Sequence, residues 1–187
     1  MDKTKLFLDM DGTIINSVQT FCEVYNEIYS TYPDFKPAKW WEVEKYNFSC
    51  QCPMVTNVHD IFSHSMFFDF VDFINGNTKE VIEELAHKYN VIICTIGVPQ
   101  NISLKALWIE KNLPFIKDMI FISHKNNTMN KNIIDMKGGI FIDDVLSNIE
   151  SSNADRKFIF GDAYEWNNGN PYIKRLINWT EVQSILL

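Results

Sequence analysis

Five short apolar runs recur along the chain, each dense in β-branched and aromatic residues and each ending in small or polar ones. None of them alternates cleanly between apolar and polar positions, which favours strands that are covered on both faces of a sheet. Runs of this length and composition are typical of buried parallel strands. The five runs cover residues 5–9, 91–95, 119–123, 139–143 and 157–160.

Helical periodicity lies between these runs. The clearest example is 78–89, where one apolar stripe follows Asn77 and Glu80, which we interpret as a capping pair. Further helices are expected over about 103–112, after Asp144 and over 180–187. Strands that alternate with helices predict an α/β fold with a doubly wound parallel sheet.

One segment, residues 14–77, interrupts the alternation after the first strand. It contains a helical stretch over 18–29 and then a run rich in aromatic residues, and the α/β rhythm resumes only at Thr78. We therefore expect a small, mostly helical cap over 14–77 that sits above the carboxyl ends of the strands, where open α/β sheets bind ligands. Residues 1–13 and 78–187 would form the catalytic core.

Composition narrows the classes of function. The chain has 187 residues, of which 46% are hydrophobic, and a formal net charge of -7, which disfavours a general nucleic-acid or anionic-membrane surface. The first apolar run is too short for a secretory segment or a membrane span, so we expect a cytoplasmic protein. The four cysteines show no paired spacing and are interpreted as thiols.

Pairs of carboxylates follow two of the predicted strands. Asp9 and Asp11 end the first strand, where Gly12 permits a sharp turn, and Asp143 and Asp144 end the fourth. Parallel strands end at the same edge of a sheet, so the four acids should converge. Their mutual repulsion requires a cation, and oxygen ligands without clustered His or Cys indicate Mg²⁺.

Candidates for holding a phosphate group come from the other strand ends. Thr95 ends the second strand, and its hydroxyl and the backbone N–H of Ile96 are placed to bind phosphate oxygens. Lys105, on the following helix, and Lys125, after the third strand, are candidates for balancing the phosphate charge. Lys131 is a rival to Lys125.

The ordered set of Asp9-x-Asp11-Gly-Thr, a strand-end Thr, a Lys and a strand ending in Asp143-Asp144 resembles the four motifs of the haloacid dehalogenase (HAD) superfamily. Within that superfamily the chain is most similar to the 5'(3')-deoxyribonucleotidases, through the length of its cap, the helix 105–108 and the closing stretch 178–182. Ile96 departs from the small polar residue typical there, and Lys125 lies unusually far before Asp143.

The resemblance implies a Rossmann-like HAD core and a phosphomonoesterase that works through an aspartyl phosphate. Asp9 would be the nucleophile and Asp11 the general acid and base. Asp9, the backbone carbonyl of Asp11, and Asp143 would hold Mg²⁺, with Asp144 behind them. Thr95, Ile96, Lys105 and Lys125 would hold the phosphate.

The aromatic cap favours a nucleotide substrate, because bases stack on aromatic rings. By likeness to the family, the expected pocket walls are Trp41, Phe67, Trp40 and Phe68. Alternatives are a phosphatase of a sugar phosphate or of a DNA 3'-phosphate, and a protein that binds a phosphorylated ligand without catalysis. The sequence leaves open the base, the sugar, the 5' or 3' position and the oligomeric state, and it is compatible with a homodimer.

Overall fold

A computed structural model describes residues 3–123 and 130–187 of the chain. Within these residues six strands form one sheet, and every neighbouring pair of strands is parallel. The strand order is β3-β2-β1-β4-β5-β6, so the chain winds outward in both directions from the central β1. The strands are β1 (Lys5–Leu8), β2 (Asn90–Gly97), β3 (Asp118–Ser123), β4 (Ile140–Asp143), β5 (Arg156–Phe160) and β6 (Lys174–Leu176).

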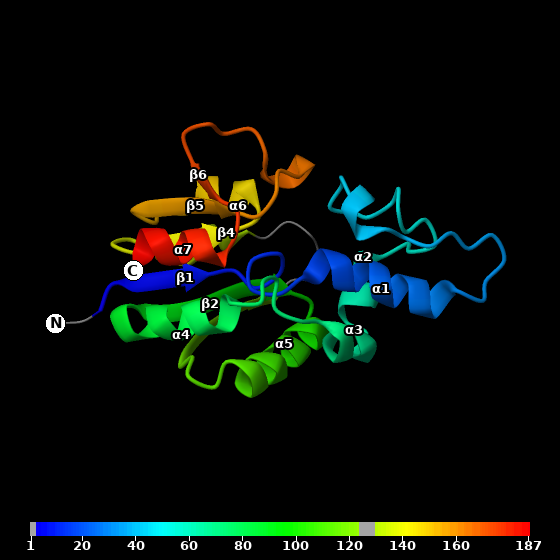
Figure 1. The fold of residues 1–187 in the computed structure, drawn as a ribbon, viewed down its shortest axis with the longest axis horizontal. Coiled ribbons are helices and arrows are strands. Elements are labelled where there is room, and N and C mark those ends of the chain that lie inside the picture. The colour runs from blue at the N-terminus through cyan, green and yellow to red at the C-terminus, as the bar shows by residue number, and fades with distance from the viewer. Residues whose placement is uncertain (1–2, 124–129) are drawn as a thin grey trace.

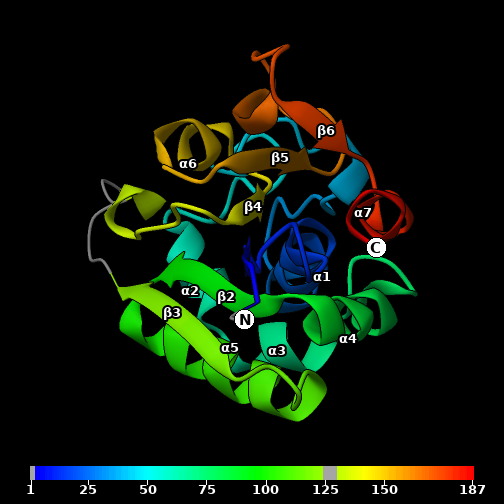
Figure 2. The ribbon, with the colours of Figure 1, turned by 90° about the vertical axis from the view of Figure 1, so that its left-hand side faces the viewer.

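Helices cover both faces of this sheet. Helices α4 (Thr78–Lys88), α5 (Pro99–Asn112) and α7 (Trp179–Leu186) lie on one face, and α6 (Leu146–Ser151) lies on the other (Figure 2). The central strand shows why both faces are closed: Leu6 and Leu8 belong to the core with α4, α5 and α7, whereas Phe7 belongs to a second core with α6. The prediction of a doubly wound parallel α/β fold is confirmed.

Differences from the expected elements are local. All five predicted strands are present, but β6 was missed, because only Leu176 of its three residues is buried and Lys-Arg-Leu carries no apolar pattern. Helix α5 begins earlier than expected, with Pro99 in its first turn. The predicted capping pair at α4 is wrong, since the Asn77 side chain makes no cap bond and instead donates to the Thr180 hydroxyl of α7 (3.1 Å).

Residues 14–77, here called the insertion, extend beyond the carboxyl ends of the strands (Figure 1). They form α1 (Ser17–Tyr29), the 3₁₀ helix η1 (Trp40–Glu42), α2 (Val58–Phe62) and α3 (Ser65–Phe70). The stretch between α1 and α2 contains η1 and is otherwise irregular, so the insertion is less helical than expected. Its aromatic residues supply the packing that regular structure does not, as in the stacked rings of Phe21 and Phe48, whose centroids are 4.0 Å apart.

The insertion is joined to the rest of the molecule by side chains of α5. The Gln100 side-chain amide donates to the carbonyl of Ser63 (2.9 Å), and the Asn101 amide donates to the carbonyl of Phe62 (2.7 Å). Both bonds satisfy carbonyls at the end of α2, which the helix itself leaves without partners. They hold the insertion above the strand ends.

Two further expectations concern membranes and thiols. In residues 3–123 and 130–187, no helix combines the length and the apolar character needed to span a membrane. Cys22, Cys50, Cys52 and Cys94 are free thiols, as the sequence predicted.

Candidate active site

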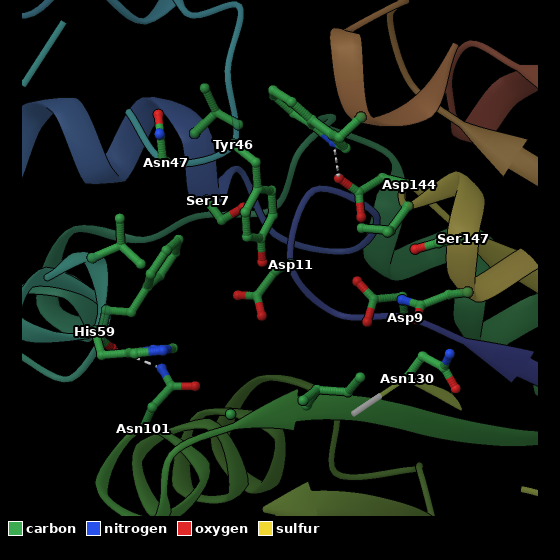
Figure 3. Close-up of a pocket in the computed structure, with 18 of the residues that line it drawn as sticks. Asp9, Asp11, Ser17, Tyr46, Asn47, His59, Asn101, Asn130, Asp144 and Ser147 are labelled. Atoms are coloured by element: carbon green, nitrogen blue, oxygen red, sulfur yellow. Dashed lines mark hydrogen bonds between the residues drawn. The ribbon is translucent and has the colours of Figure 1, made fainter. Parts of the chain in front are cut away.

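A cavity of about 440 Å³ opens between the strand ends and the insertion. Asp9, Asp11 and Asp144 line it from the sheet side and project into the same space (Figure 3). The insertion supplies the facing wall, which includes Tyr46 and His59. The acids therefore lie where a ligand can reach them.

The loop after β1 places the first two acids. The amide of Asp9 donates to the carbonyl of Ile142 (2.9 Å), which ties the end of β1 to β4. The chain then coils so tightly that several later amides donate to the carbonyl of Met10. Gly12 has φ +69°, and a Cβ atom there would lie 2.5 Å from a carboxylate oxygen of Asp144. Glycine is required both by the backbone and by the approach of that acid.

Asp143 is fully buried, and both of its carboxylate oxygens already have protein partners. One oxygen accepts a hydrogen bond from Lys131 Nζ (2.6 Å), and the other accepts one from the backbone amide of Val145 (2.7 Å). The Asn148 side chain lies within 3.1 Å and 3.3 Å of the two oxygens. Asp143 is thus fixed within the protein, and it is absent from the lining of the cavity.

Lys131 is the ammonium group at the centre of the acids. Its side chain is 1% exposed and forms ion pairs with Asp9 and Asp143. It begins the 3₁₀ helix η2 (Lys131–Ile133), and the side chain of Asn130 caps this helix by accepting a hydrogen bond from the backbone amide of Asn132 (3.1 Å). Lys125, the other candidate for the motif lysine, lies outside the described residues.

Burial and mutual repulsion perturb these acids. Burial, together with the charges of Asp143 and Asp11, raises the pKa of Asp9 to about 7, although Lys131 opposes the rise. Burial, together with the charges of Asp9 and Asp143, also raises the pKa of Asp144 well above its usual range. Burial disfavours a charged Lys131, but Asp143 and Asp9 outweigh it and hold its pKa well above the ordinary value.

A second lysine holds Asp11. Lys105, which is 1% exposed, donates to the Thr95 hydroxyl (2.8 Å), to the carbonyl of Ile96 (2.9 Å) and to one carboxylate oxygen of Asp11. The other oxygen of Asp11 is buried and has no hydrogen-bond partner. Lys105 therefore ties the end of β2 to the acid and leaves one acid oxygen available.

The four aromatic residues expected to wall the pocket lie elsewhere. Trp41 is 65% exposed, and Trp40, which contacts it edge to face, is 38% exposed. Phe67 is fully buried and packs against Phe62 and Phe68 inside the insertion. None of the four lines the cavity.

Other aromatic residues take that place. Tyr46, Phe48 and Phe62 line the cavity from the insertion, and Trp166 lines it from the segment after β5. Sequence reasoning missed Trp166, although the strand-end rule that found the acids also applies to β5, because its carboxyl end meets the same edge of the sheet. No comparable signal marks Tyr46 among its many aromatic neighbours.

Comparison with known families agrees with this geometry. Residues 3–187 match the family model described as "5' nucleotidase, deoxy (Pyrimidine), cytosolic type C protein". The chain belongs to this nucleotidase family. It is 29% identical over 191 residues to a 5'(3')-deoxyribonucleotidase of Bacillus subtilis, with 99% of each chain covered. It is 26% identical over 186 residues to one of Clostridium acetobutylicum, covering 99% of this chain and 96% of that protein.

Solved structures place the nucleotidase-family chain within the HAD fold. A haloacid dehalogenase-like hydrolase of Streptococcus pneumoniae superposes with a TM-score of 0.62 at 12% identity, with 99% of each chain covered. YfnB of Bacillus subtilis, solved bound to magnesium, superposes with a TM-score of 0.63 at 13% identity, covering 100% of this chain and 99% of that one. The resemblance inferred from the motifs is confirmed, and the chain is a phosphohydrolase of the nucleotidase family.

Proposed function

We propose that this protein is a Mg²⁺-dependent phosphomonoesterase that removes phosphate from deoxyribonucleoside monophosphates through an aspartyl phosphate on Asp9. The observation that carries the proposal is the buried group of Asp9, Asp143 and Asp144, which each offer an oxygen within 4.8 Å of the others. In this proposal residues 1–13 and 78–187 form the catalytic core, and residues 14–77 form the cap that receives the rest of the substrate.

The charges of the site fit a divalent cation. In the described part of the chain, three buried carboxylates gather around the ammonium group of Lys131, and burial together with the mutual repulsion of the acids raises the pKa values of Asp9 and Asp144. Oxygen ligands alone suit Mg²⁺. When bound, Mg²⁺ would offset the charge of the phosphate and polarise its oxygens.

We assign the metal to Asp9, Asp144 and the backbone carbonyl of Asp11. Asp144 lines the cavity, and among the described residues the one hydrogen bond to its carboxylate comes from Trp166 and reaches one of the two oxygens. Asp143 already uses both oxygens within the protein. This assignment exchanges the roles that the resemblance implied for the two neighbouring acids, because Asp143 would instead fix Lys131.

Asp9 and Asp11 divide the chemistry. An oxygen of Asp9 attacks phosphorus, the bond from phosphorus to the substrate oxygen breaks, and Asp11 gives that oxygen a proton. Asp11 then takes a proton from water, which attacks the phosphoryl group on Asp9, so that phosphate leaves and the carboxylate is restored. The oxygen of Asp11 that has no protein partner is the one suited to this work.

The two buried lysines, Lys131 and Lys105, have different roles. Lys131 bridges the nucleophile and Asp143, so it offsets repulsion between Asp9 and an incoming phosphate. Lys105 holds the general acid in place and fixes the Thr95 hydroxyl, which is fully buried, so phosphate oxygens would be bound by the backbone that follows, where Ile96 lines the cavity.

The substrate class rests on the relatives and on the cavity. Both curated relatives carry the name 5'(3')-deoxyribonucleotidase, and the cavity volume lies in the usual range for small-molecule sites. Its far wall combines rings such as Phe62 with polar side chains such as Asn47. A base and a sugar would find both kinds of partner there.

A phosphate-release panel tests the proposal. With Mg²⁺ present, the protein is offered deoxyribonucleoside and ribonucleoside monophosphates, sugar phosphates and a 3'-phosphorylated oligonucleotide. We expect the largest kcat/KM among the deoxyribonucleoside monophosphates and no release in excess chelator. A larger kcat/KM for a sugar phosphate or for the oligonucleotide would contradict the substrate class, and undiminished release in chelator would contradict the metal.

A further inference from the structure

Trp166 makes three directed contacts around the acid site. Its indole Nε1 donates to a carboxylate oxygen of Asp144 (3.1 Å). Its ring stacks on Tyr164 with centroids 4.3 Å apart and planes 4° from parallel, and the ring of Tyr46 meets it edge to face at 5.8 Å. A side chain from beyond β5 thus touches both an acid of the core and a ring of the insertion.

The backbone that carries Trp166 is held firmly. It lies in the 3₁₀ helix η3 (Glu165–Asn167), whose last residue, Asn167, is buried and donates to the carbonyl of Asp162 (2.9 Å). Asn167 also accepts from the amide of Tyr164 (2.9 Å), and Arg175 donates to its carbonyl (2.7 Å). The indole N–H is therefore aimed by the fold and not by a mobile loop.

Asp144 depends on this donor. In the described part of the chain, Trp166 is the only residue that donates a hydrogen bond to the Asp144 carboxylate, and the acids Asp9 and Asp143 each place an oxygen within 4.8 Å of it. The backbone at Gly12 packs against the same carboxylate and leaves no room for a side chain there. The indole holds one oxygen, and the other oxygen points toward Asp9 (Figure 3).

We propose that Trp166 is a positioning residue that orients Asp144 for the metal, and that Tyr46 of the insertion supports it from the other side. This inference rests on the proposed function, because it assumes that Asp144 binds Mg²⁺. Hydrogen bonds to metal-binding carboxylates commonly set the affinity of the metal. The contact with Tyr46 makes the insertion part of the metal site as well as of the substrate site.

The test measures Mg²⁺ binding without substrate, by following the backbone amide signals of Gly12 and Val145 in NMR titrations. Trp166→Phe keeps an aromatic ring beside Tyr164 but removes the N–H donor, so the dissociation constant should rise roughly 10- to 100-fold. Trp41→Phe, the same change at an exposed site outside the cavity, is the matched control and should bind as the wild type does. Equal affinity in Trp166→Phe and the wild type would overturn the proposal.

Tyr46 is tested in the same way. Tyr46→Phe keeps the edge contact and should retain wild-type affinity, whereas Tyr46→Ala should weaken Mg²⁺ binding between roughly twofold and tenfold, the range for one lost aromatic pair. In a Trp166→Phe background, Tyr46→Ala should cause no further loss of Mg²⁺ affinity, because Tyr46 acts on the metal site through Trp166. A full additional loss in the double variant would overturn the support role of Tyr46.

A measurement on the unmodified protein covers the case in which Trp166→Phe does not fold. The chain has five tryptophans, and assigned indole N–H signals can be followed during the Mg²⁺ titration. The Trp166 signal should move with the same dissociation constant as the Gly12 amide, while that of Trp41 stays in place. A Trp166 signal that does not move would overturn the inference, whereas a protein with no Mg²⁺ response at all would instead contradict the proposed metal site.

Discussion

Lys131 supplies the positive charge that pairs with Asp9. Its ammonium group is buried between the carboxylates of Asp9 and Asp143. Removing the lysine would therefore leave two buried negative charges without a partner. The sequence offered Lys125 and Lys131 as alternatives, because a long side chain on a connection between strands can reach the site from several positions. Lys131 contacts Asp9, and Lys125 lies outside the described residues, so the assignment of Lys131 as the motif lysine stays a prediction.

Lys131→Ala should lower kcat by roughly 10²–10³, the cost of removing one preorganised donor from a reacting group. The unfolding free energy should fall by about 3–5 kcal/mol, since Asp9 and Asp143 lose their shared partner. Steady-state kinetics and denaturant unfolding measure the two effects. Lys117→Ala, at an exposed position, is the control, and a Lys131→Ala variant as active as this control would contradict the assignment.

The meeting of acids from two strands could be predicted because it follows from topology. Parallel strands end at one edge, so Asp9 and Asp143 had to lie close together once β1 and β4 were neighbours. Which of Asp143 and Asp144 faces the cavity could not be predicted, because it depends on hydrogen bonds from Val145 and Asn148 that consume the oxygens of Asp143.

At the scale of elements, the strands and helices of the core were predictable and the insertion was not. The core elements bury continuous apolar runs, which leave a strong periodic signal. The stretch between α1 and α2 is held by ring contacts such as that of Phe21 with Phe48, and such contacts have no periodicity in sequence. Aromatic richness therefore favoured a cap in this segment without showing which rings line the cavity.

Trp41 provides a test of the insertion. Because its side chain is 65% exposed and outside the cavity, Trp41→Ala should leave kcat/KM for a deoxyribonucleoside monophosphate within about twofold of the wild type. The same assay with a sugar phosphate, which has no base, controls for a loss of activity toward every substrate. A loss of 1–3 kcal/mol confined to the nucleotide would show that Trp41 stacks on the base after all.

Helix α7 ties the end of the chain to the site loop. Trp179, at its start, is fully buried and donates from its indole nitrogen to the carbonyl of Thr13 (2.9 Å), two residues after Asp11. Trp179→Ala should cost about 3–5 kcal/mol of unfolding free energy through the cavity it leaves. Thermal unfolding measures this, with Trp41→Ala as the exposed control, and equal stability of the two variants would contradict the packing.

Over the whole molecule, folding and metal binding are expected to be linked. Buried carboxylates that repel one another oppose the folded state, so a cation that binds only the folded protein should stabilise it. At a Mg²⁺ concentration of 100 times the dissociation constant, the gain is about 2.7 kcal/mol. Melting temperatures in Mg²⁺ and in chelator should differ accordingly, and identical values would contradict a metal site among the acids.

The proposed reaction begins when the carboxylate of Asp9 attacks the phosphate of a nucleotide. The most direct measurement compares phosphate release from a deoxyribonucleoside monophosphate by the wild type and by Asp9→Asn, with Mg²⁺ and at matched folded concentration. The amide keeps the size of the side chain but removes the attacking charge, so the variant should retain less than about a hundredth of the wild-type rate. A well-folded Asp9→Asn variant that keeps more than this would contradict the assignment of Asp9 as the nucleophile.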